Sequence, residues 1–227
     1  MSEDEEMKKF VFVILYFVVL QCGFSQSFPL PNLQGGWERI VIENFGSFDI
    51  PPTMELQGGS YLKTKKALES ILKMNQSTFQ IIVQQKGLND RTSEGYSRYA
   101  RVMFKTETGS RDTELIIDFD VKQFTPSEIS GLNDMYKGAM QIQSASTGLK
   151  LLEWYPLKIE IINGMSCIHT SYIRQLSNNE PVIVHQYSFF NYDYDHTFIL
   201  SYRQNEKDYW EKDFMTILNS LRIRKRE

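Results

Sequence analysis

The chain has 227 residues, of which 41% are hydrophobic and 13% aromatic, so it can form a folded core and wholesale disorder is excluded. Its 25 Lys and Arg against 28 Asp and Glu give a net charge of −3, which provides no global field for nucleic acid or an anionic membrane. Two cysteines are too few for a disulfide-dense scaffold or a multi-cysteine zinc or iron–sulfur site.

The N-terminal segment has the composition of a secretory signal peptide, predicted as residues 1–25. Residues 10–20 (FVFVILYFVVL) are apolar and uncharged, but a bilayer core requires about 20 such residues, so this run is too short to span a membrane. Lysines precede the run and small residues follow it, which is the order of a signal peptide. We therefore predict cleavage between Ser25 and Gln26 and export of the protein to the bacterial periplasm or cell envelope.

Two observations leave the N-terminal processing open. Residues 2–6 (SEDEE) are acidic, whereas the leading part of a signal peptide is basic, so Met7 is an alternative start. Cys22 directly follows the apolar run, where bacterial lipoproteins carry their lipidated cysteine, although Gln21 stands where a small residue is expected. We therefore expect membrane contact only through the signal peptide or through a lipid anchor at Cys22.

The remaining chain is predicted to hold one domain. Residues 26–36 (QSFPLPNLQGG) contain two prolines and two glycines, and we interpret them as an extended linker. No internal repeat or second boundary follows, so residues 37–223 are assigned to one domain and residues 224–227 to a basic tail. Cys167 is the only cysteine left after cleavage, so it cannot form an internal disulfide and is expected to be a small buried side chain.

The front half of this domain is predicted to contain short strands separated by turns. Apolar residues at helical spacing also indicate a short helix within residues 54–74. Alternation of apolar and polar residues indicates strands at residues 37–44, 47–50, 78–86 and 96–106.

A longer helix is predicted to begin after residue 125. Thr125 is a typical N-cap, Pro126 suits the first turn, and Glu128 can complete a capping box by accepting a bond from the N-cap backbone. The face that this helix would bury consists of Ile129, Leu132, Tyr136, Ala139 and Met140.

The back half is predicted to be a run of strands closed by a second helix. Short turns link the strands, so neighbours must pair antiparallel, and Asn163-Gly164 is the strongest hairpin signal. Strands interrupted by two separate helices predict a single-domain α+β fold in which helices cover an antiparallel sheet. The strands are expected at residues 150–155, 157–162, 165–175, 182–191 and 197–203. The helix, beginning near residue 205, is amphipathic and would bury Trp210, Phe214, Ile217, Leu218 and Leu221.

A set of short motifs carries a family resemblance. It consists of the Ile162-Asn163-Gly164 turn, Tyr172-x-Arg174, the Tyr187 to Asn191 strand, Ser201-Tyr202-Arg203 and the helix with Trp210, Phe214, Leu218 and Leu221, with residues 50–55 and 84–89 matching more loosely. By these motifs the chain resembles the PsbP-like superfamily, including its DcrB-type exported bacterial proteins. The resemblance implies an α/β/α sandwich around an antiparallel sheet. It also implies a non-enzymatic accessory, binding or assembly role, and it supplies no catalytic signature.

Cys167 and His169 are the candidate nucleophile and base. Two residues apart on a strand, they share a face, and a thiol beside an imidazole can form an activated nucleophile. Same-face neighbours on one strand lie about 6.5 Å apart, however, which is beyond hydrogen-bond reach. We therefore expect no catalytic residue, and the alternative function is an envelope hydrolase that uses this pair or a carboxylate pair.

No metal or cofactor site is predicted. Asp193 and Asp195, in the segment NYDYDH, are candidate metal ligands, but the glycine and distal glutamate of a calcium loop are missing and such residues favour hairpin turns. No glycine-rich phosphate-binding motif is present, so no nucleotide cofactor is expected. The basic C-terminal residues suit a helix end, and we expect no nucleic-acid partner.

Aromatic residues in the back half provide the candidate binding site. Tyr172 and Arg174 share a strand face, and polar-tipped aromatic side chains beside an arginine suit ligand or protein binding. With Trp154 and Tyr155 they form the predicted site for a ligand or partner. We therefore predict a non-enzymatic binding or accessory/assembly factor of the cell envelope, whose partner is an unknown envelope protein or a small ligand.

Overall fold

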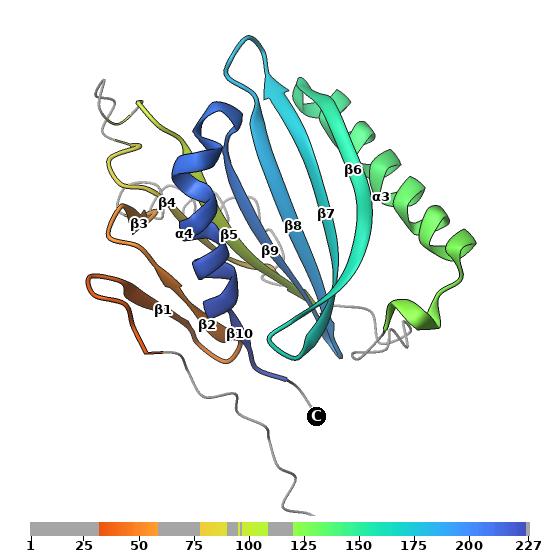
Figure 1. Cartoon of the computed structure of the whole chain (residues 1–227), viewed down its shortest axis with the longest axis horizontal. Coiled ribbons are helices and arrows are strands. Elements are labelled where there is room, and N and C mark those ends of the chain that lie inside the picture. The colour runs from red at the N-terminus through yellow and green to blue at the C-terminus, as the bar shows by residue number, and fades with distance from the viewer. Residues whose placement is uncertain (1–31, 59–77, 90–94, 96, 109–119, 226–227) are drawn as a thin grey trace, which may run out of the picture. The chain divides into compact units, whose positions relative to one another are not determined.

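An antiparallel sheet is the central layer of the fold (Figure 1). The computed structural model describes residues 32–58, 78–89, 95, 97–108 and 120–225. The predicted signal peptide, its cleavage site and Cys22 therefore lie outside the described residues. So do residues 59–74 of the segment predicted to hold a short helix. Within them, the sheet has the strand order β3-β4-β5-β9-β8-β7-β6. Its strands are β3 (Met54–Leu56), β4 (Thr78–Gln85), β5 (Ala100–Thr108), β6 (Leu149–Ile162), β7 (Met165–Leu176), β8 (Val182–Asn191) and β9 (Tyr194–Arg203).

A second, smaller sheet and two α-helices complete the described part of the chain. The small sheet has the order β1-β2-β10, with β2 between the other two. Its strands are β1 (Glu38–Ile42), β2 (Gly46–Ile50) and β10 (Arg222–Ile223). The helices are α3 (Pro126–Thr147) and α4 (Lys207–Ser220), preceded by the 3-10 turns η1 (Val121–Gln123) and η2 (Gln204–Glu206). No helix of this part is long and apolar enough to cross a membrane.

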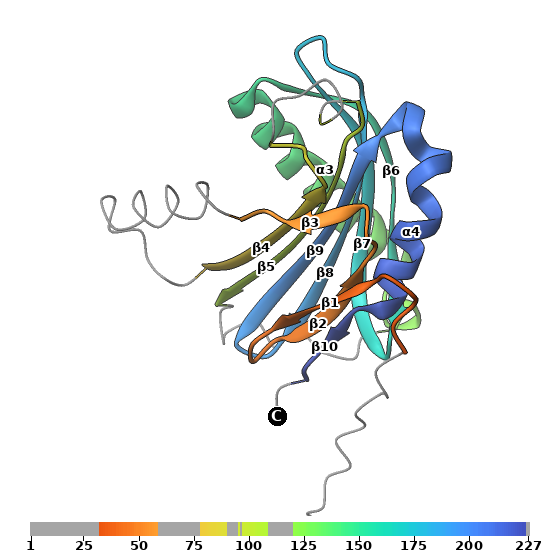
Figure 2. The same ribbon diagram turned by 90° about the vertical axis from the view of Figure 1, so that its left-hand side faces the viewer.

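The two helices lie on opposite faces of the central sheet. Figure 2 shows α4 on one side of the strands and α3 on the other. The small sheet packs on the same face as α4, because its apolar residues share one buried core with that helix. This arrangement confirms the predicted α+β fold with an antiparallel sheet between helices.

The core under α4 is the larger of the two hydrophobic clusters. Phe48 of β2, Phe104 of β5 and Phe198 of β9 are fully buried in it, and the rings of Phe48 and Phe198 meet edge to face at 5.3 Å. The predicted inner side of the C-terminal helix is confirmed, because all of its apolar residues are buried. They are Trp210, Phe214, Ile217, Leu218 and Leu221.

The start of α3 matches the predicted capping box. The Thr125 hydroxyl accepts a bond from the Glu128 amide at 3.3 Å, and the Glu128 carboxylate accepts from the Thr125 amide at 2.7 Å. The bond from the Thr125 backbone, followed by that from its side chain, holds the pKa of Glu128 below its ordinary value. At the other end Gly148 adopts a left-handed conformation (φ 71°), which stops the helix.

The face that α3 turns to the sheet is narrower than predicted. Leu132 and Tyr136 pack against Leu157 and Ile168 of the sheet, as expected. Ala139 was predicted on the same face but is exposed. The helix lies mainly along the edge strand β6, so only a thin stripe of its surface is covered.

The two strands predicted on either side of Pro156 are one strand, so that prediction is wrong. β6 continues from Leu149 to Ile162, with register shifts between Leu151 and Glu153 and between Tyr155 and Lys158. Proline cannot donate to a strand partner, but an edge strand with a bulge tolerates it. β6 is the last strand of the sheet, so the missing backbone donor of Pro156 need not cost a hydrogen bond to a second neighbouring strand.

Two other strands begin at residues different from those predicted. β9 begins at Tyr194 instead of residue 197, and β5 at Ala100 instead of residue 96. The Asn163-Gly164 hairpin is confirmed, with φ of 50° and 80° at the two residues. The Asn163 amide also donates to the carbonyl oxygens of Leu218 (3.3 Å) and Leu221 (2.6 Å), so this turn caps the C-terminus of α4.

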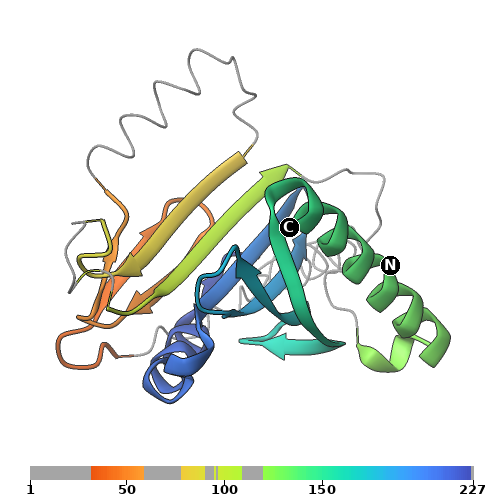
Figure 3. The same cartoon turned by 90° about the horizontal axis from the view of Figure 1, so that it is seen from above.

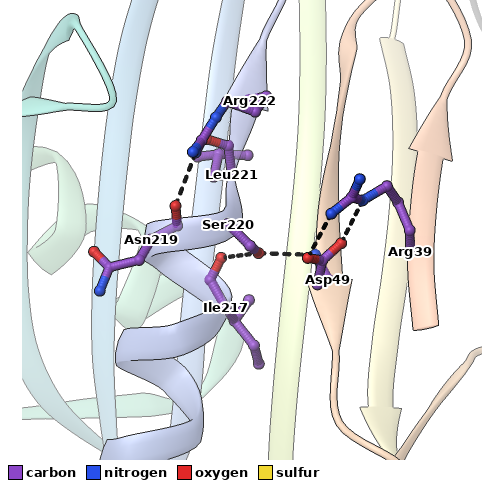
Figure 4. Close-up of polar contacts among 7 residues, drawn as sticks. All are labelled: Arg39, Asp49, Ile217, Asn219, Ser220, Leu221 and Arg222. Atoms are coloured by element: carbon purple, nitrogen blue, oxygen red, sulfur yellow. Dashed lines mark hydrogen bonds and ion pairs between the residues drawn. The ribbon is translucent and has the colours of Figure 1, made fainter. Parts of the chain in front are cut away.

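A buried ion pair joins the small sheet to the end of α4 (Figure 4). Arg39 of β1 binds both carboxylate oxygens of Asp49, at 2.7 and 2.9 Å. The Asp49 amide donates to the Ser220 hydroxyl at 2.8 Å, and this hydroxyl donates to the Ile217 carbonyl oxygen at 2.6 Å. The bidentate geometry satisfies a carboxylate that is almost wholly buried.

Candidate functional site: a histidine pair beside Glu160

The register of β6, β7 and β8 brings several titratable side chains to the face that carries α4. Glu160 of β6 pairs with Cys167 of β7, and His169 of β7 pairs with Tyr187 of β8. His185 lies two residues before Tyr187 and therefore points to the same side of the sheet. These residues come from three strands, so only the folded sheet assembles them.

The contacts form a chain from a carboxylate through two imidazoles. His169 Nδ1 lies 3.3 Å from Glu160 Oε2, and His169 Nε2 lies 3.2 Å from His185 Nδ1. The His169 ring stacks on Tyr187 with centroids 4.3 Å apart and planes 16° from parallel. His169 is buried, whereas Glu160 and His185, at the two ends of the chain of contacts, are partly exposed.

Burial favours the neutral forms of both histidines. It lowers the pKa of His185 to about 4, and the charges of the neighbouring His169 and Lys207 act in the same direction. Burial also lowers the pKa of His169, although Glu160 opposes the shift. A positive charge on both rings would place two cations 3.2 Å apart, which also disfavours double protonation.

Cys167 lies on the same face as His169, as predicted, but its surroundings do not favour a nucleophile. The side chain is fully buried, and burial followed by the charge of Glu160 raises its pKa to about 12. A reactive cysteine requires the opposite shift, because the thiolate is the nucleophile. The environment fits the small buried side chain that the sequence predicted.

The predicted aromatic site is divided by the sheet. Trp154 and Tyr172 stack with centroids 5.8 Å apart and planes 11° from parallel, on the face that carries α3. Arg174 shares that face, and its charge opposes the rise that burial causes in the pKa of Tyr172. Tyr155 pairs with Ser171, so it points to the opposite face, where it is exposed.

Trp154 also holds α3 to the sheet. Its Nε1 donates to the Asn133 side-chain oxygen at 2.9 Å, and the Leu157 amide donates to the same oxygen at 3.0 Å. Tyr172, beneath it, is almost fully buried. Trp154 and Tyr172 therefore pack between helix and sheet, while Tyr155 remains available at the surface.

Asp193 and Asp195, the candidate metal ligands, lie at the hairpin between β8 and β9. Asp195 pairs with Glu107 of β5, and burial together with the charge of Glu107 raises its pKa. His196 points to the other face, where it contacts Thr106 and Asn191. Among the described residues, no group of three or more His, Cys, Asp or Glu side chains is placed to hold a metal ion.

The sequence pointed to His169 but not to the partners that surround it. A two-residue hairpin turn at Asn163-Gly164 fixes the register of the two strands and places Glu160 opposite Cys167. The position of Glu160 near His169 could therefore have been predicted from the sequence. His185 belongs to a strand that follows a longer turn, whose register the sequence does not specify.

Comparison with known proteins shows the fold. The sequence matches no protein-family model and no curated protein. Among solved structures the chain is similar to cyanobacterial PsbP (CyanoP) from Synechocystis sp. PCC 6803, with 14% sequence identity, a TM-score of 0.50, and coverage of 86% of this chain and 99% of that one. The described domain therefore has a PsbP-like fold, which confirms the resemblance at the level of the fold.

Two further structures are more distant. A protein from Bacteroides thetaiotaomicron VPI-5482 has 8% identity and a TM-score of 0.43, covering 85% of this chain and 50% of that one. PA94, a protein of unknown function from Pseudomonas aeruginosa, has 10% identity and a TM-score of 0.37, covering 82% and 95%.

Proposed function

We propose that this chain is an exported, non-enzymatic binding or accessory protein of the bacterial cell envelope, which recognises a partner protein along the edge strand β6. The signal-like N-terminal sequence supports export, and the PsbP-like fold is compatible with an accessory role. The observation that carries the proposal is the exposed apolar edge of the sheet.

α3 covers part of the edge strand β6, where the Leu157 amide donates to the Asn133 side chain of the helix at 3.0 Å. Beyond this contact β6 is long and carries exposed apolar side chains. It pairs with β7 alone, and no described strand occupies its other edge. Leu152, Tyr155 and Ile161 are exposed along it, and Ile161 retains 67% of its accessible surface. Exposed apolar side chains on an open strand edge are a feature of protein recognition, where a partner supplies a further strand or an apolar surface.

The same strand carries features that prevent uncontrolled pairing. Pro156 removes one backbone donor, and the two register shifts bend the strand on either side of it. Residues 149–155 and 157–162 are therefore two short edges instead of one long one. A short extended segment of a partner fits such an edge better than an indefinite stack of copies does.

A crosslinking experiment tests this recognition surface. A photo-crosslinking phenylalanine analogue replaces Tyr155 in one variant and the exposed Val41 of β1 in the control, and both are expressed in the native host. We expect a discrete crosslinked partner from position 155 only, lost when Leu152→Asp is added. Equal crosslinking from both positions, or none from position 155, would contradict the proposal.

Mass spectrometry of the mature N-terminus tests the processing of the chain, because it distinguishes an N-terminus at Gln26 from one at a lipidated Cys22.

An envelope hydrolase is the second candidate, favoured by the chain from Glu160 through His169 to His185. A carboxylate that orients an imidazole is an element of general-base catalysis. The carboxylate pair found in register among the described strands, Glu107–Asp195, lies on the opposite face of the sheet, toward α3, and so does not extend this chain. A Cys167→Ala/His169→Ala variant that keeps its crosslinked partner and phenotype would eliminate the thiol form of this candidate, whereas loss of a measured hydrolase activity would establish it.

A further inference from the structure

The outer face of α3 is unusually apolar for a helix surface that meets solvent. Met135 and Ile142 are 60% and 75% exposed there. Gly131 and Gly138 alternate with them at spacings of four, three and four residues, which place all four on one side of the helix. Leu132 and Tyr136 face the sheet, so this apolar face, on the other side of the helix, points away from it. Figure 3 shows α3 along the outside of the sheet. A solvent-facing helix surface normally carries charged and polar residues.

Within the described chain, no steric contact requires a glycine at position 131 or at position 138. A Cβ atom at Gly131 or at Gly138 would meet no heavy atom within 4 Å. Glycine inside a helix is less favourable than alanine, so these two glycines weaken α3 without helping its packing on the sheet. Glycine does allow another helix to approach closely, because it presents no side chain at the contact.

We infer that α3 packs antiparallel against α3 of a second copy of this chain, around a two-fold axis near residues 136 and 137. In that register, Met135 of one copy faces Gly138 of the other, and Ile142 faces Gly131. Both contacts form together because the two residue pairs share one midpoint. Each large side chain thus enters the space above a glycine, as in knobs-into-holes packing, and the face is complementary to itself, as a two-fold interface requires.

The expected dimer is weak. A stable interface buries about 1,600 Å² in total, and one pair of helices with glycines at the contact buries less. Association is therefore expected only at high protein concentration or where the chain is concentrated at a surface. The inference does not rest on recognition through β6, because it uses the outer face of α3, whereas recognition through β6 uses the exposed side chains of that strand.

Analytical ultracentrifugation of the purified protein, up to its highest soluble concentration, tests the inference. We expect a reversible monomer–dimer equilibrium whose dissociation constant rises at least tenfold in Ile142→Lys. Val41→Lys is the matched control, because Val41 is 71% exposed on β1, and it should leave the equilibrium unchanged. Circular dichroism of each variant confirms that it is folded.

An exchange of one contact pair tests the register itself. Gly138→Met should weaken the dimer severalfold, because two large side chains then meet across the axis, and Met135→Gly/Gly138→Met should regain most of the loss, because a large side chain again faces a glycine. A protein that is monomeric at every concentration would overturn the inference. So would a dimer that withstands Ile142→Lys, or a double variant no stronger than Gly138→Met alone.

Discussion

Replacing His185 with glutamine should remove much of the acid sensitivity of this fold. His185 has a pKa of about 4 in the folded protein, against an ordinary value of 6.5, because burial disfavours its charged form. A histidine with a lowered pKa stabilises the fold while it is neutral. That contribution is fully present above pH 6.5 and is lost as the pH falls toward 4, because the unfolded chain binds the proton first.

The magnitude follows from the two pKa values. Between pH 7 and pH 5 the unfolded histidine becomes mostly protonated while the folded one stays mostly neutral, which removes about 2 kcal/mol of unfolding free energy. Glutamine is polar and can still bond to His169 Nε2, but it does not titrate. The His185→Gln variant should therefore lose about 2 kcal/mol less than the parent protein over the same interval.

Urea unfolding at several pH values, followed by tryptophan fluorescence, measures the effect. The comparison is between the two pH slopes, so titration of the carboxylates common to both proteins cancels. Glu160→Gln serves as a second variant: it removes the charge that opposes the low pKa of His169, so its stability should fall more steeply with acid than that of the parent. Parallel curves for the parent and His185→Gln would refute the reasoning.

Three further substitutions test the contacts that hold the layers together, each by urea or thermal unfolding. Asp49→Ala removes a carboxylate that accepts two bonds from Arg39 and should cost about 2 kcal/mol, whereas Arg39→Met/Asp49→Leu should recover most of it; equal losses would contradict a paired role. Asn163→Ala removes two bonds to the end of α4 and strains a positive φ, so it should cost about 2 kcal/mol, and Asn163→Gly clearly less. Asn133→Ala should cost more than Trp154→Phe, about 2 against 1 kcal/mol, because it leaves two donors unsatisfied; the reverse order would show that the indole bond dominates.

Much of the fold could be predicted because its signals are local. The capping box at Thr125 and the Asn163-Gly164 hairpin depend on neighbouring residues, and both are present. The apolar face of α4 follows from spacing within one helix. Pro156 was misinterpreted because its tolerance depends on β6 being an edge strand, and strand order is set by contacts between distant segments.

The candidate site was less predictable for the same reason. Alternation placed Cys167 and His169 on one face, but it did not show which side chains on other strands would surround them. Glu160 and His185 reach His169 only through the registers of β6 with β7 and of β7 with β8. Alternation also separated Tyr155 from Trp154, since adjacent residues of a strand face opposite sides, and the predicted four-residue group did not take this into account.

The small sheet joins the beginning of the domain to its end. β2 lies between β1 and β10, so residues 46 and 47 acquire their second neighbour only from residues 222 and 223. A side chain at Gly46 would collide with the Arg222 carbonyl oxygen, so the closing strand requires this glycine. A chain that emerges N-terminus first cannot complete this sheet, or the Asp49–Ser220 contact, until residues 220–223 are also free. The last step in folding of this domain therefore waits for the strand that closes the small sheet.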